Sequence, residues 1–153
     1  MWPVIATGFI ILGVLAARGV RPAYIAFVAL GVAFLPARVG FQFTPAPCEL
    51  EFSLALALHS LRNYPHIVLF GLFTMITSAQ FSVETRWRYL VALLAVISMG
   101  VVIEAEQGFT GRGHCRLRDL VPDLAGFLVV TLGSLVWTQI RGRNRGAAIG
   151  RAG

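Results

Sequence analysis

Residues 120–140 read LVPDLAGFLVVTLGSLVWTQI, an apolar run that contains one charged residue, Asp123, and is followed by Arg141. A helix that crosses a bilayer needs about 20 such residues. Four more apolar runs come near this length, at residues 2–17, 22–36, 66–81 and 89–103. The runs are continuous rather than alternating, which indicates helices and not barrel strands. We therefore predict an all-α, polytopic transmembrane helix bundle of about five membrane helices.

The composition favours lipid as the solvent of this chain. Only 13% of the residues are charged and 57% are hydrophobic, whereas about a quarter of the residues in a soluble domain are charged. The arginines lie between the apolar runs and do not form one basic face, which argues against a nucleic-acid partner. Residues 1–141 form the expected bundle, and residues 142–153 form a basic tail rich in glycine, alanine and arginine.

The two N-terminal runs are short for spanning helices. The turn Arg-Gly-Val-Arg-Pro at residues 18–22 separates them and places a proline where a helix can start. Two short spans would need a thinned bilayer or arginine side chains that reach its surface, and a re-entrant hairpin over residues 2–36 is the alternative. No basic region precedes the first run, so we interpret it as a retained segment and not as a signal peptide.

The arginines predict which helix ends face the cytoplasm. With five spans, one side would hold eight arginines and one acid, Glu84, whereas the other would hold five arginines and most of the acids. The first group is Arg18, Arg21, Arg86, Arg88, Arg141, Arg143, Arg145 and Arg151, and the second is Arg38, Arg62, Arg112, Arg116 and Arg118. Because cytoplasmic loops carry the excess of arginine, we predict a protein of the bacterial inner membrane with a cytoplasmic C-terminus.

Both cysteines fall on the predicted periplasmic side. Cys48 lies in the connection over residues 37–65, and Cys115 lies in the connection over residues 104–119. The topology argument does not use the cysteines, and the periplasm is oxidising. We therefore predict a Cys48–Cys115 disulfide, with two unpaired cysteines as the alternative. Residues 49–64 are typical of a helix with mixed faces that either lies in the membrane interface or caps the bundle.

Polar residues gather where the last two runs meet the periplasmic side. Glu104 and Gln107 share a face at the end of one helix, and Asp119 and Asp123 share a face at the start of the next. Asp119 is also placed to cap that helix. Because ionisable groups near lipid are costly unless they are paired, we predict a salt-bridged boundary cluster of Glu104, Gln107, Arg112, Asp119 and Asp123. A catalytic pair of carboxylates is the alternative.

Three arginines and one histidine are candidate ligand-binding residues. Arg112 is flanked by glycines and lies near Arg116 and Arg118, so these three are candidates for binding an anion or a lipid headgroup, with a tight turn as the alternative. His66 is a candidate pigment or haem ligand, with hydrogen bonding at the boundary as the alternative. The histidines and cysteines lack zinc-ligand spacing. We expect no metal and no cofactor beyond bound lipid and peripheral pigment contact.

The order of the polar residues resembles the C-terminal signature of the VanZ-like membrane proteins. That signature has Glu-x-x-Gln, an arginine loop, an aspartate, and Asn-x-x-Gly at the head of the last helix. Here the order is Glu104-x-x-Gln107, Arg112, Asp119 and Asp123-x-x-Gly126, with Asp123 in place of the asparagine. His66, followed by an apolar run with Phe70, is also similar to the histidine-led helix of that family. Over residues 59–135 the resemblance implies an envelope protein linked to low-level teicoplanin resistance.

Two functions fit these features. The first, which we favour from the sequence, is a non-catalytic accessory subunit that packs against a larger membrane complex, such as a photosynthetic or other bioenergetic assembly. Gly126 and Gly133 lie seven residues apart on the last run, and such a stripe suits close contact between membrane helices, within the chain or with a partner. The second is a VanZ-type envelope protein that acts on lipid or cell-wall intermediates at the outer leaflet.

Overall fold

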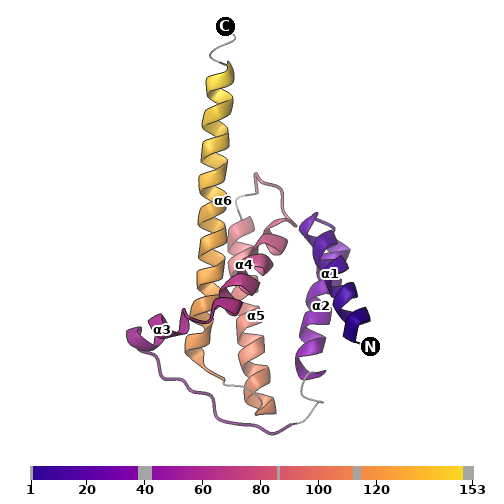
Figure 1. Cartoon of the computed structure of the whole chain (residues 1–153), viewed down its shortest axis with the longest axis vertical. Coiled ribbons are helices and arrows are strands. Elements are labelled where there is room, and N and C mark those ends of the chain that lie inside the picture. Colours follow the sequence, from indigo (N-terminus) through magenta and orange to yellow (C-terminus); the bar gives the residue numbers. More distant parts are fainter. Residues whose placement is uncertain (1, 38–42, 86, 112–114, 150–153) are drawn as a thin grey trace.

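The computed structural model describes residues 2–37, 43–85, 87–111 and 115–149. Within these ranges the regular elements are all helical, so the all-α class is confirmed for this part of the chain. They are the α-helices α1 (Trp2–Ala17), α2 (Arg21–Ala37), α3 (Leu54–Ser60), α4 (Tyr64–Ser78), α5 (Arg88–Thr110) and α6 (Leu120–Ile149), and the 3₁₀ helix η1 (Leu117–Asp119). Figure 1 shows α6 as the longest helix, which extends beyond the others toward the C-terminus.

The turn predicted at residues 18–22 joins α1 and α2 as an antiparallel hairpin (Figure 1). Gly19 has a φ of 81°, which a glycine adopts without strain. A Cβ at this position would also lie 3.0 Å from the carbonyl oxygen of Ala79. The side-chain amide of Gln80 donates to the carbonyl oxygen of Ala16 at 2.6 Å. The turn of the hairpin therefore lies at the same end of the bundle as the connection from α4 to α5, which we call the arginine-rich end.

The connection after α2 meets the connection after α5 at the opposite end. The backbone N–H groups of Thr44 and Ala46 donate to carbonyl oxygens in the last turn of α5, at 3.1 and 2.8 Å. These hydrogen bonds satisfy carbonyls that the end of a helix otherwise leaves without partners. Cys48 and Cys115 lie at this end, which we call the disulfide end. Helices α1, α2, α4, α5 and α6 therefore run in alternating directions between two ends (Figure 1).

The core lies where α4, α5 and α6 meet. Phe70, Ala92, Val96 and Phe127 are buried there. Helix α6 approaches α4 closely at Gly126, where a Cβ would lie 2.8 Å from the amide nitrogen of Gly71. Gly126 therefore lies where the backbones of α4 and α6 approach each other closely. By contrast, a Cβ at Gly133 would have no atom within 4 Å in the described part of the chain.

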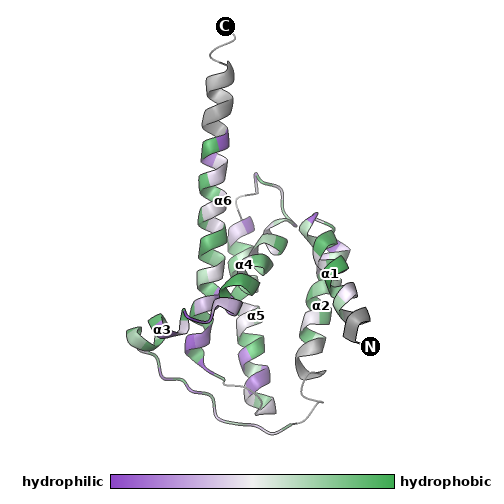
Figure 2. Ribbon diagram, in the orientation of Figure 1, coloured by the Kyte–Doolittle hydropathy of each residue, from purple (hydrophilic) through white to green (hydrophobic). Residues whose placement is uncertain are grey.

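In the described part of the chain, two helical segments are long and apolar enough to cross a membrane, Arg88–Thr110 and Leu117–Arg141. Three shorter apolar segments are Ala6–Ala17, Arg21–Ala33 and Tyr64–Ser78. Figure 2 shows the middle of α6 as largely apolar, with hydrophilic residues near its start and just before the part drawn in grey. Large apolar side chains on α6, among them Val129, Leu132 and Val136, are more than half exposed. A continuous exposed apolar surface of this kind indicates contact with lipid or with another protein.

Some element boundaries differ from the sequence-based expectation. Helix α5 continues past residue 103 to Thr110 and ends where Gly111 adopts the left-handed conformation, with a φ of 58°. Helix α6 continues through the first part of the basic tail to Ile149. Arginine and alanine are good helix formers, and adding a residue to an existing helix requires no new nucleation. Residues 150–153 lie outside the described residues.

The helix expected over residues 49–64 is shorter than predicted. Residues 49–53 lie outside regular helix, and the Ser53 hydroxyl accepts a hydrogen bond from the Leu56 N–H at 3.2 Å, which starts α3 at Leu54. Helix α3 contacts η1 and α6, and it buries Ala57 and Ser60. Leu54 and Leu58, on the other hand, are exposed. The segment therefore covers part of the disulfide end with one face and leaves an apolar face uncovered.

Candidate functional site at the disulfide end

An extended segment of the chain, residues 43–53, runs along the disulfide end (Figure 1). Cys48 in this segment and Cys115 before η1 are at disulfide distance, with Cα atoms 4.7 Å apart. Gly108 makes room for them, because a Cβ there would lie 2.9 Å from the Sγ of Cys48 and 3.4 Å from the Sγ of Cys115. The sequence-predicted pair is therefore brought together against the last turns of α5.

Glu49 joins the same two segments through its backbone and its side chain. Its N–H donates to the Cys115 carbonyl at 2.9 Å, and its carbonyl accepts from the Leu117 N–H at 3.1 Å. Its carboxylate lies 3.2 Å from the Arg116 Nε and 3.0 Å from an Arg118 Nη. Two guanidinium groups thus share one half-exposed carboxylate. An anion that binds Arg116 and Arg118 would have to compete with Glu49.

Glu104 lies one helical turn before Gly108 on α5. Its carboxylate accepts a hydrogen bond from the Arg116 backbone N–H at 2.6 Å. Only 9% of Glu104 is exposed. The Arg116 N–H therefore supplies the buried carboxylate with a hydrogen bond that water would supply to an exposed one. The bond holds the chain between Cys115 and η1 against α5.

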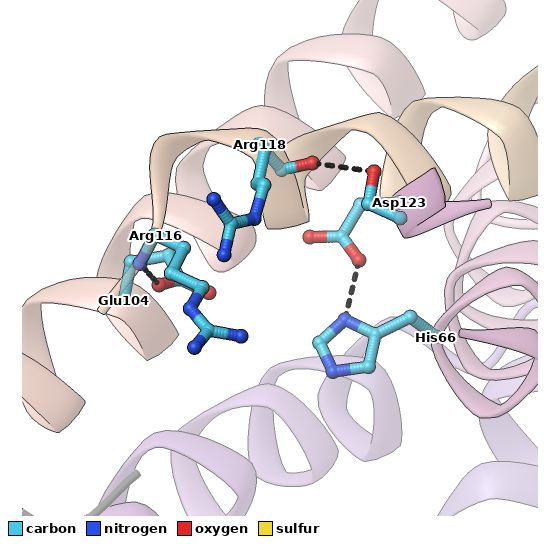
Figure 3. A network of polar contacts seen from close by, with 6 residues as sticks. His66, Glu104, Arg116, Arg118 and Asp123 are labelled. Carbon is cyan, nitrogen blue, oxygen red and sulfur yellow. Dashed lines mark hydrogen bonds and ion pairs between the residues drawn. The ribbon is translucent and has the colours of Figure 1, made fainter. Parts of the chain in front are cut away.

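Asp123 and His66 form the innermost polar contact at this end (Figure 3). The Nδ1 of His66 lies 2.7 Å from the Oδ1 of Asp123, and only 2% of Asp123 is exposed. Gly100 of α5 leaves space for the other carboxylate oxygen, because a Cβ there would lie 2.8 Å from it. Helices α4, α5 and α6 therefore all contribute to this contact. A pigment or haem ligand at His66 stays a prediction, and its Nε2 would have to serve as the ligand atom.

These contacts form two neighbouring sets, one of His66 and Asp123 and the other of Glu49, Glu104, Arg116 and Arg118. The six residues together are called the polar cluster below. Figure 3 shows five of them, with His66 and Asp123 facing the two arginines. The boundary cluster predicted from the sequence agrees with it in Glu104 and Asp123. Asp119 ends η1, directly before α6, and Gln107 lies partly buried on α5. Arg112, the third residue proposed for anion binding, lies outside the described residues.

Sequence reasoning missed Glu49 and Ser60. The Ser60 hydroxyl donates to the Arg118 carbonyl at 3.0 Å, which ties α3 to η1. A signal for Glu49 is present in the sequence, since a residue next to Cys48 must lie near Cys115 and Arg116 if the cysteines pair. The position of Ser60 gives no such signal, because it depends on how α3 crosses the end of the bundle.

An apolar cavity of about 250 Å³ lies next to the polar cluster, between the α1–α2 hairpin and the helices α4 and α5. Its walls include Phe9 and Phe27 of the hairpin, Leu69, Phe70 and Phe73 of α4, and Met99 and Ile103 of α5. Phe70 stacks on the ring of His66, with ring centroids 6.0 Å apart, and Ile103 directly precedes Glu104. One end of the cavity therefore adjoins the polar cluster.

The contacts within the polar cluster favour a structural role for its carboxylates over a catalytic role. Each of its carboxylates has a partner from another segment of the chain. Among the described residues there is no group of three or more histidine, cysteine, aspartate or glutamate side chains that could hold a metal ion. These groups can position a ligand by hydrogen bonding, and the cavity can accept an apolar chain.

The fold and this end of it define a class of protein, an all-helical bundle with an ion-paired end tied by two cysteines at disulfide distance. No family model matches the chain, and neither does any curated protein or solved structure.

Proposed function

We propose that this chain is a five-span protein of the bacterial inner membrane, with the disulfide end in the periplasm and the C-terminus in the cytoplasm. The alternation of five apolar helices between two ends supports this topology. Helices α1 and α2 have 16 and 17 residues, or about 25 Å each at 1.5 Å per residue. A locally thinned bilayer accommodates spans of this length. The excess of arginine at the other end supports its cytoplasmic placement.

We further propose that the protein is a non-catalytic, VanZ-type envelope protein that binds a lipid or a lipid-linked cell-wall intermediate at the outer leaflet. The observation that carries this proposal is the cavity of about 250 Å³ that adjoins the polar cluster. Pockets for drug-sized ligands measure about 300–1,000 Å³, so this one suits a single hydrocarbon chain. A chain seated there would place its headgroup beside His66 and the arginines of the polar cluster.

This proposal is tested by binding of a polyprenyl phosphate to the purified protein, measured by native mass spectrometry. The variant Phe73→Trp fills the cavity, and we expect it to weaken binding at least tenfold. Leu132→Trp adds the same ring on the exposed face of α6 and should bind as the unchanged protein does. Equal binding by both variants would refute the role of the cavity. Expression in a susceptible host should raise teicoplanin tolerance, and Phe73→Trp should remove that effect.

A second candidate function is the accessory subunit of a larger membrane complex. It is favoured by the uncovered face of α6, where Leu128, Leu132 and Val136 are exposed and Gly133 has open space beside it. Purification in mild detergent separates the two functions. A stoichiometric complex with other integral membrane subunits, with or without pigment, would support the subunit. A monomer that binds the polyprenyl phosphate would contradict it.

A further inference from the structure

Two hollows lie side by side at the arginine-rich end, between α6 and the connection from α4 to α5. The first, of about 370 Å³, is lined mainly by apolar side chains such as Met75, Phe81 and Val130. The second, of about 520 Å³, is lined by Val83 and Trp137 together with charged and hydroxyl side chains, among them Glu84, Thr138 and Arg141. Val83, Arg88 and Ser134 line both hollows. The two therefore form one amphipathic groove, with an apolar part that leads into a polar part.

Each of two arginines in the groove lies against an aromatic ring: Tyr89 lines the first hollow, and Trp137 lines the second. The guanidinium of Arg88 lies 4.3 Å from the ring centroid of Tyr89 and donates to the Tyr89 hydroxyl. The guanidinium of Arg141 lies 5.0 Å from the ring centroid of Trp137. A guanidinium has five N–H donors, so one that lies against a ring retains donors for an anion. Among the described residues that line the second hollow there are two cations, Arg88 and Arg141, and one acid, Glu84, so an anion is favoured here.

The groove lies where the apolar run of α6 ends at Ile140 and the arginines begin. This is the level at which a cytoplasmic headgroup meets its acyl chains in the proposed topology. Tryptophan and tyrosine are enriched at this level, and basic pockets between membrane helices on the cytoplasmic side bind anionic headgroups. A free phosphate would use only the polar part and leave the apolar part unfilled.

We propose that this groove binds one anionic phospholipid of the cytoplasmic leaflet, with its phosphate between Arg88 and Arg141 and an acyl chain along Met75 and Phe81. The inference rests on the proposed membrane placement, and it is independent of the choice between the two candidate functions. The site is distinct from the cavity beside the polar cluster, because the two share no lining residue.

The test is native mass spectrometry of the full chain in detergent, with phosphatidylglycerol, phosphatidylcholine or inorganic phosphate added. We expect phosphatidylglycerol to be retained about tenfold better than phosphatidylcholine, and inorganic phosphate not to compete with it. The double variant Arg88→Gln/Arg141→Gln should reduce phosphatidylglycerol retention to the level of phosphatidylcholine. Arg62→Gln serves as the control. It removes a positive charge from an exposed residue in the connection between α3 and α4.

A second variant separates loss of the site from loss of the fold. Val83 is 70% exposed and lines both hollows, so Val83→Trp should obstruct the groove without a change of charge and lower phosphatidylglycerol retention. Phe73→Trp, which fills the cavity at the disulfide end, should leave it unchanged. Equal retention of both phospholipids, competition by inorganic phosphate, or full retention by the arginine variant would overturn the proposal.

Discussion

Gly71 of α4 and Gly126 of α6 face each other so closely that a Cβ on Gly126 would lie 2.8 Å from the amide nitrogen of Gly71. Backbones that approach in this way are typical of helix contacts inside membranes, where small residues allow dense packing. The contact fixes how α6 lies along α4. It therefore also fixes where Asp123, three residues before Gly126, meets His66, five residues before Gly71.

Replacing Gly126 by alanine should destabilise the bundle. The added methyl would meet backbone atoms of Ile67 and Gly71, which cannot move without moving α4, and overpacking of this kind costs about 1–3 kcal/mol. The measurement is the thermal unfolding temperature in detergent. Gly133→Ala, on the same helix but in open space, is the control and should unfold as the unchanged protein does. Equal unfolding temperatures for the two variants would contradict the packing.

The losses of stability from replacing His66 and Asp123 should not be additive, because the two side chains share a hydrogen bond. His66→Ala leaves a carboxylate that is only 2% exposed without its partner, which should cost about 1–3 kcal/mol. The double variant His66→Ala/Asp123→Asn should lose less stability than the sum of the two single variants. The exposed His59, changed to alanine, is the control. Additive losses, within about 0.5 kcal/mol, would show that the two side chains do not interact.

Glu49→Gln should loosen the extended segment by a smaller amount. The variant removes the carboxylate charge that Arg116 and Arg118 share. Because that carboxylate is half exposed, we expect a loss of about 1 kcal/mol or less, which decreases further at high salt. Thermal unfolding at two salt concentrations measures it. Glu51 is an exposed acid of the same segment, and Glu51→Gln should not change the unfolding temperature. An equal loss of stability in both variants would show that the effect is not specific to Glu49.

Reduction of the cysteines should destabilise the disulfide end. A bond between residues separated by 67 positions restricts the unfolded chain by about 4 kcal/mol in entropy models, and strain often lowers this value. The unfolding temperature should fall when reductant is added, and it should not respond in the double variant Cys48→Ser/Cys115→Ser. Two reactive thiols in protein purified without reductant would show that the Cys48–Cys115 disulfide does not form.

Hydrophobic runs in the sequence predicted where most helices lie, because a long apolar run between arginines is compatible with few structures other than a helix. The ends of α5 and α6 were less predictable. The spacing of Glu104 and Gln107 predicted that this helix extends past residue 103, but the apolar pattern does not mark its end at Thr110.

The polar cluster was predictable only in part. The side chains of Glu104 and Asp123 stand out as acids next to apolar runs. Their partners depend on contacts between distant segments. His66 meets Asp123 because Gly71 and Gly126 set the helix contact, and Glu49 reaches the arginines because the extended segment pairs with residues 115–117. A single sequence does not show which residues of two distant segments lie opposite each other.

We propose that the two ends of this bundle lie on opposite sides of the inner membrane, with the polar cluster at the periplasmic end. The most direct measurement labels single cysteines in intact cells with a membrane-impermeant maleimide, in the Cys48→Ser/Cys115→Ser background. Glu51→Cys reports on the disulfide end and Glu84→Cys on the arginine-rich end, and both positions are exposed. We predict labelling at position 51 in intact cells, and labelling at position 84 only after the cells are permeabilised. Labelling of position 84 in intact cells, or equal labelling of both positions, would contradict the account.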